Sequence, residues 1–153
     1  MERRVKEAFC VIGREGSTGE GAGFVQRLWK EANERYGEIA PLVRMDENGG
    51  PAGFWGAMSG PERDFAPWAD GFTRGLYLAG AEVRPDAEPP EGWVKWTVPG
   101  YEYVVVKAEG EDSFAKGLRY IEENGLTLAG AVNDFMNPKE DGQPYMYFPI
   151  RKL

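Results

Sequence analysis

Apolar and polar residues alternate in several short runs of the chain, and a period of two predicts β-strands. The clearest run is LYLAGAEV, residues 76–83, in which two leucines, Gly80 and Glu82 share one face. A glycine inside a strand marks a bulge or a close approach to the backbone. Gly80 and Glu82 together therefore predict the wall of a cavity. The alternative is a strand end at which Glu82 reaches water.

A period of three to four residues predicts two amphipathic helices. The first runs from Phe24 to Tyr36, with apolar residues at intervals of four, and the second lies within residues 111–125. The glycine-rich segment 16–23 before the first helix is not a phosphate loop. It lacks the Lys-Ser/Thr ending, and its Glu20 would repel phosphate.

The order strand, helix, strand, strand occurs twice, in residues of about 5–84 and about 93–153. Short matches follow the same order in both halves, for example VIGREG at 11–16 and VVKAEG at 105–110. One such unit is too thin to bury both faces of its sheet. We therefore predict a single α+β domain over residues 1–153. In it, two pseudo-symmetric β-α-β-β units form one antiparallel sheet backed by two helices, with a ligand cleft between the units.

The second half repeats the glycine and carboxylate pattern. In LTLAGAVNDF, residues 126–135, we predict a strand on which Gly130, Val132 and Asp134 share one face. If Glu82 and Asp134 are buried, desolvation raises at least one pKa and creates a proton donor or an anchor for a cation. The alternative is that each carboxylate lies at a frayed strand end in water.

Composition limits the chemistry. The chain has no histidine, which excludes Ser-His-Asp and Cys-His catalysis and histidine-ligated metal, and we predict no metal and no cofactor. Its one cysteine, Cys10, allows no internal disulfide. The net charge of -7 and the lack of a basic cluster oppose direct nucleic-acid binding. No signal peptide or membrane-spanning run is found, so we predict a cytoplasmic protein without a membrane partner.

Five strings of this chain resemble the GyrI-like family, also called the AraC effector-binding domain or bacterial transcription activator effector-binding domain. They are FWGAMSG, FAPWADGFTRGLYLAGAEV, PEGWVKWTVPGYEYVVV, LAGAVNDF and YMYFPI. The resemblance covers Val5 to Leu153 and implies a pseudo-twofold sheet with a ligand cleft. Fused members of the family sense small, often aromatic and cationic, compounds for a DNA-binding partner domain. Stand-alone members include gyrase-inhibiting proteins and hydrolases that open the cyclopropane of DNA-alkylating toxins.

The resemblance also implies site residues. The family's acidic pocket residue on the penultimate strand corresponds to Asp134, and Glu82 would be its acidic partner from the first unit. We expect aromatic side chains to complete the ligand site: Trp55, Trp68, Tyr77, Trp96, Tyr101, Tyr103 and Tyr145. Several aromatic walls, each contributing roughly 0.5 to 2 kcal/mol to holding a cation, would give micromolar binding.

Three functions follow from these residues. The leading hypothesis is a binding protein for a small apolar or cationic molecule, aromatic or xenobiotic, that acts by sequestration or informs a separate regulator protein. The second is a hydrolase for cyclopropane-bearing genotoxins. In it Glu82 or Asp134 would position water, and Tyr103 or a protonated carboxyl would activate the leaving carbonyl. The third is an acidic module that inhibits a DNA enzyme such as gyrase through its charged surface.

Overall fold

The computed structural model describes residues 1–47, 49–137 and 141–153. The strands within these residues are β1 (Glu2–Lys6), β2 (Phe9–Ser17), β3 (Phe54–Ser59), β4 (Leu76–Val83), β5 (Val94–Val98), β6 (Tyr101–Lys107), β7 (Asn133–Met136) and β8 (Pro144–Lys152). The α-helices are α1 (Phe24–Glu34), α2 (Ala69–Phe72) and α3 (Ser113–Glu123), and the short 3-10 helices are η1 (Thr18–Glu20), η2 (Tyr36–Glu38) and η3 (Ala40–Leu42). The strands form one antiparallel sheet, so the predicted α+β class is confirmed.

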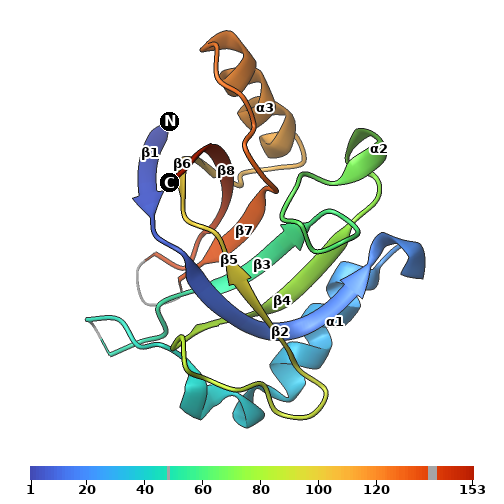
Figure 1. Cartoon of the computed structure of the whole chain (residues 1–153), viewed down its shortest axis with the longest axis vertical. Helices are drawn as coiled ribbons and strands as arrows, with labels where there is room; N and C mark the ends of the chain where they lie inside the picture. Colours follow the sequence, from blue (N-terminus) through green and yellow to red (C-terminus); the bar gives the residue numbers. More distant parts are fainter. Residues whose placement is uncertain (48, 138–140) are drawn as a thin grey trace.

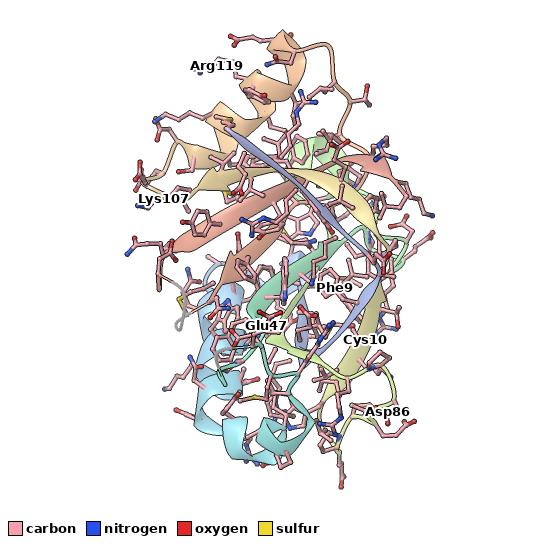
Figure 2. The ribbon with its side chains drawn as sticks, turned by 90° about the vertical axis from the view of Figure 1, so that its left-hand side faces the viewer. Phe9, Cys10, Glu47, Asp86, Lys107 and Arg119 are labelled. Atoms are coloured by element: carbon pink, nitrogen blue, oxygen red, sulfur yellow. The ribbon has the colours of Figure 1, made fainter. Side chains whose placement is uncertain are left out.

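The strand order, β1-β6-β8-β7-β3-β4-β2-β5, is symmetric about its centre. The first half contributes β2, β4 and β3, and the second half contributes β6, β8 and β7. The two halves meet where β3 pairs with β7, here called the β3–β7 seam. Helix α1 packs against β2 and β4, and α3 packs against β6 and β8 in the same way. Figure 1 and Figure 2 both show α3 at the top of the molecule and α1 in its lower part.

Each half gives its first strand to the other half, which the repeat pattern did not predict. Strand β1 pairs with β6, and β5 pairs with β2. Two-residue links join β1 to β2 and β5 to β6, although these strands lie near opposite edges of the sheet. Three Cα steps span at most about 11 Å. The sheet therefore curls until its two edges approach each other.

Alternation along the strands separates two faces of the curled sheet. The inner one, here called the aromatic face, carries a cluster that includes Phe9, Trp55, Tyr103 and Tyr147. The other, the helix face, packs against α1 and α3. Phe9 and Cys10, labelled in Figure 2, are consecutive residues of β2 and belong to the aromatic face and the helix face respectively.

The predicted strand over residues 126–135 is wrong in its first part. Strand β7 begins at Asn133, because the preceding backbone makes hydrogen bonds outside its ladder. The Ala129 N–H donates to the Pro149 carbonyl at 2.8 Å, and the Ala131 N–H donates to the Phe65 carbonyl at 2.9 Å. Residues 126–132 thus join β8 to the loop between β3 and β4.

Two further boundaries differ from the prediction. The apolar stripe of the first helix continues to Tyr36, but α1 ends at Glu34 and Tyr36 begins η2. The repeat predicts one strand before the first helix, but the structure has two, β1 and β2, which join different parts of the sheet. In the part of the chain that the structure describes, no helix has the length and apolar character needed to span a membrane.

Candidate functional site

A cleft of about 500 Å³ lies on the helix face, above the β3–β7 seam and beside α1. This volume is typical of small-molecule sites, which measure about 300–1,000 Å³. The cleft is lined by Trp29, Asn33, Phe54, Gly56, Tyr77, Ala108, Asp134, Phe135, Met136, Pro144 and Tyr145. Most of these residues are apolar or aromatic, and Asp134 is the one carboxylate among them.

A chain of hydrogen bonds holds Asp134 in the floor of the cleft. The Tyr77 hydroxyl donates to Asp134 Oδ2 at 2.8 Å. Trp29 Nε1 in turn donates to the Tyr77 oxygen at 3.0 Å. The three residues come from β7, β4 and α1, so the cleft is assembled from both halves of the chain.

Gly56 makes the contact between Tyr77 and Asp134 possible. It lies on β3, between the strands that carry these two residues, and pairs with Asp134. A Cβ atom at Gly56 would lie 1.8 Å from the Tyr77 hydroxyl oxygen. Because glycine has no side chain, the tyrosine ring crosses β3 and reaches the next strand.

Burial dominates the electrostatics of this pair. It raises the pKa of the Asp134 carboxyl above its ordinary value of 3.8, and the hydrogen bond from Tyr77 partly offsets this effect. Burial and the nearby carboxylate raise the pKa of Tyr77 well above 10, so its hydroxyl stays protonated and acts as a donor. Among the residues with described positions, no lysine or arginine forms an ion pair with Asp134. Within those described residues, the ionised form of Asp134 therefore has a hydrogen-bond donor but no counter-charge.

Glu82 is also buried, but it lies on the aromatic face. Trp55 Nε1 donates to Glu82 Oε1 at 3.2 Å. Lys6 Nζ lies 3.1 Å from the same oxygen, and Arg44 Nη1 lies 3.3 Å from Oε2. Lys6 also lies 4.6 Å from the centre of the Phe9 ring. The charge of Glu82 is thus balanced within the protein.

The two carboxylates do not share one site. Glu82 shares a face of β4 with Gly80, which pairs with Trp55, whereas Asp134 pairs with Gly56 on the opposite face of β3. The prediction that Glu82 and Asp134 belong to a repeated pattern, and so occupy equivalent positions in the two halves, is therefore wrong. In the symmetric strand order β7 corresponds to β3, and β4 corresponds to β8.

Solved structures share this fold at low sequence identity. SAV2435, solved bound to tetraphenylphosphonium, is 15% identical with a TM-score of 0.67 over 98% of this chain and 93% of its own. The EcmrR C-terminal domain is 10% identical with a TM-score of 0.65 over 99% and 97% of the two chains. EcmrR in a DNA complex has the same TM-score, 0.65, and identity, 10%, with 57% of its chain covered. This chain has the GyrI-like fold. No protein-family profile and no curated protein matches its sequence.

Within the GyrI-like fold, the predicted ligand residues fall into three places. Tyr77, Asp134 and Tyr145 line the cleft, and Trp68 lines a neighbouring hollow. The remaining predicted residues lie on the aromatic face: Trp55, Glu82, Trp96, Tyr101 and Tyr103. Of the three catalytic candidates, Asp134 is the one in the cleft, separated by the sheet from Glu82 and Tyr103.

The centre of the aromatic face is packed with its own side chains, and two hollows, of about 280 and 390 Å³, are lined in part by Phe135 and Tyr147. The Trp55 ring centre lies 4.5 Å from that of Phe135 and 5.1 Å from that of Tyr147. Tyr103 packs on Tyr147 at 5.3 Å and is fully buried. These aromatics form the core that the curled sheet encloses.

The sequence analysis did not name eight of the eleven residues that line the cleft, among them Trp29, Phe54 and Gly56. Trp29 lies within the predicted first helix, and an indole N–H that is partly buried needs a hydrogen-bond acceptor. Gly56 lies inside a strand, and this position was a signal for close approach of another group. Phe54 carried no signal of its own.

Proposed function

We propose that this chain binds a small lipophilic cation in the helix-face cleft, with Asp134 as the counter-charge. The observation that carries the proposal is a partly buried carboxylate at the floor of an aromatic cleft, without a cationic partner in the described part of the chain. A bound cation would compensate the desolvated charge. Tetraphenylphosphonium bound to SAV2435, a protein of the same fold, supports this choice of ligand class.

The lining of the cleft suits such a ligand. Trp29 and Phe54 contribute aromatic rings to the cleft that holds the carboxylate. Each ring face that contacts a desolvated cation contributes roughly 0.5 to 2 kcal/mol, and the charge pair is stronger in the cleft than in water. A dissociation constant in the micromolar range, about -8 kcal/mol, follows from two or three such contacts and the charge pair.

We further propose that binding serves sequestration or sensing in the cytoplasm. In the sensing role, the loaded protein would inform a separate regulator protein. The matching part of EcmrR is a C-terminal domain, and EcmrR itself has been solved with DNA. The fold is thus found within a larger chain that contacts DNA, which supports the sensing role.

Tryptophan fluorescence during titration with tetraphenylphosphonium tests the binding proposal, because Trp29 lines the cleft. We expect saturable binding that weakens at least tenfold in Asp134→Asn, the loss of one charge-assisted contact of about 1.4 kcal/mol or more. The matched control is Asp86→Asn, which removes the same charge from a carboxylate that is 88% exposed. The tetraphenylborate anion has the same shape and the opposite charge. Equal binding of the anion, or an unchanged affinity in Asp134→Asn, would exclude Asp134 as the counter-charge.

A further inference from the structure

A second hollow, of about 240 Å³, lies on the helix face beside the cleft. Its described lining residues are all apolar, among them Met58, Phe114 and Met146. An engineered apolar cavity of about 150 Å³ holds benzene, so this hollow has room for one aromatic ring or an alkyl chain of similar bulk. Nothing in the proposed binding of a compact cation uses this space.

The hollow begins where the cleft ends. On β3 the cleft is lined by Gly56 and the hollow by Met58; on β8 the corresponding residues are Pro144 and Met146. Each step of two residues keeps the side chain on the same face and advances by about 7 Å. The two cavities therefore lie end to end along the same strands.

Two methionines stand at the boundary between the cavities. Met58 pairs with Tyr77, and Met146 pairs with Asp134, so both thioether side chains flank the Tyr77–Asp134 hydrogen bond. Methionine is unbranched and adapts its shape to a neighbour. A cation held at Asp134 thus lies against a deformable wall, with the apolar hollow behind it.

The loop between β3 and β4 forms the outer wall of the hollow. Its Phe72 ring meets the Phe114 ring of α3 edge-on, with centres 5.2 Å apart, and Trp68 Nε1 donates to the Leu76 carbonyl at 3.0 Å. The described non-glycine residues with positive φ all lie in this loop: Arg63, Phe65, Asp70 and Phe72. This conformation is unfavourable for bulky side chains and clusters at ligand clamps. The loop is thus held over the hollow at a conformational cost.

We propose that the hollow takes an apolar arm of the ligand whose cationic head pairs with Asp134. The ligand class is then an elongated lipophilic cation, with an aryl group or a short alkyl chain extending past Met58 and Met146. This inference rests on the proposed function, since it places the head of the ligand in the cleft. It adds the requirement that the ligand be long enough to reach from the cleft into the hollow.

The test uses methyl-, butyl- and hexyltriphenylphosphonium, which share one cationic head. In the unmodified protein we expect affinity to rise by up to about fourfold for each methylene that enters the hollow. Ala131 is buried and lines the hollow, so Ala131→Phe places a ring in that space. In this variant the dependence on chain length should disappear, while the affinity for the methyl compound stays the same.

A second variant covers the case in which Ala131→Phe does not fold. Phe72 is 38% exposed, and Phe72→Ala opens the outer wall without disturbing a buried core. The hexyl compound should lose affinity at least fivefold and the methyl compound should not. Met45→Ala removes another exposed hydrophobic side chain, which lines neither cavity, and serves as the matched control.

The outcomes separate this inference from the proposed function. If the methyl compound binds through Asp134 and the effect of chain length survives in both variants, the hollow is not the site of the arm and the binding function stands. If none of the three compounds binds, the proposed function and the inference both fail. Loss of the effect of chain length in either folded variant, with retained methyl binding, supports the inference.

Discussion

Glu82 and Asp134 lie in the same sheet, Glu82 fully buried and Asp134 partly buried, and their surroundings differ in one decisive respect. Glu82 accepts a hydrogen bond from Trp55 and forms ion pairs with Lys6 and Arg44. The recorded partner of Asp134 is the neutral hydroxyl of Tyr77. One carboxylate is balanced by the protein's own cations, and the other lines a cleft in which a foreign cation has room.

This difference separates a structural charge from a candidate binding charge. The cost of burying a charge must be offset by an opposite charge or by hydrogen bonds. Whether the opposite charge comes from the protein or from a ligand separates a structural carboxylate from a binding one. For Glu82 the source includes β1, which comes from the first half of the sequence and pairs with the second half. Glu82 thus helps to hold the exchanged strand in place. For Asp134 no cation of the described residues supplies the opposite charge, and under the proposed function a bound ligand would do so.

The largest expected effect is on stability, in Glu82→Gln. The substitution keeps an acceptor for Trp55 but leaves Lys6 and Arg44 without their counter-charge, and we expect a loss of about 2 to 3 kcal/mol in the free energy of unfolding. This is the low end for a buried pair because both cations reach solvent. Urea denaturation measures it. The control is Glu109→Gln, which breaks the exposed ion pair with Lys107. Its free energy of unfolding should change by less than about 1 kcal/mol.

A smaller effect is expected for Tyr77→Phe. It leaves Trp29 Nε1 and Asp134 without their shared partner, at a cost of about 1 to 2 kcal/mol. The hydrogen bond from Tyr77 lowers the pKa of Asp134, so its removal raises that pKa further. Cation binding needs the ionised carboxylate and is lost as pH falls through this pKa. Fluorescence titrations at a series of pH values should therefore show the loss at higher pH than in the unmodified protein; an unmoved or lowered midpoint would contradict the assignment.

The smallest effect, with the opposite sign to that of Glu82→Gln, is expected for the stability of Asp134→Asn. Because the pKa of Asp134 is raised in the folded state, its contribution to stability is greatest below the unfolded value of about 3.9. That contribution is lost as pH rises through the folded value. Asparagine carries no charge, so the variant should be more stable than the parent by up to about 1 kcal/mol at pH 7. Urea unfolding at pH 7 and pH 4 should show this gain shrinking at the lower pH.

The sequence predicted much of the fold because periodicity is a local signal. The alternation in residues 76–83 placed Glu82 on one face and Tyr77 on the other, as the structure shows. The period of three to four residues likewise predicted the helix α3, whose Phe114 packs against the sheet. The exchange of β1 and β5 was not predictable in this way, because pairing between distant strands leaves no local period.

The candidate site was predicted in part, for the same reason. Asp134 and Tyr77, both named as ligand residues, line the cleft, and their role in binding stays a prediction. Glu82 was assigned to the same cleft because its pattern resembles that of Asp134, but the face of each residue depends on the register between strands. The role of Gly56 depends on a side chain that crosses a whole strand, which a linear pattern does not record.

The exchanged edge strands have a mechanical consequence for the cleft. The cleft lies over the β3–β7 seam, where a hinge between the halves would have to open. Any such opening would pull on two short connections at once, because β1 and β5 each tie one half to the far edge of the other. The pairing of β1 with β6 and of β5 with β2 therefore holds the two halves together on both sides of the seam. Under the proposed function, ligands of different sizes would then be accommodated by movement of side chains above a rigid floor.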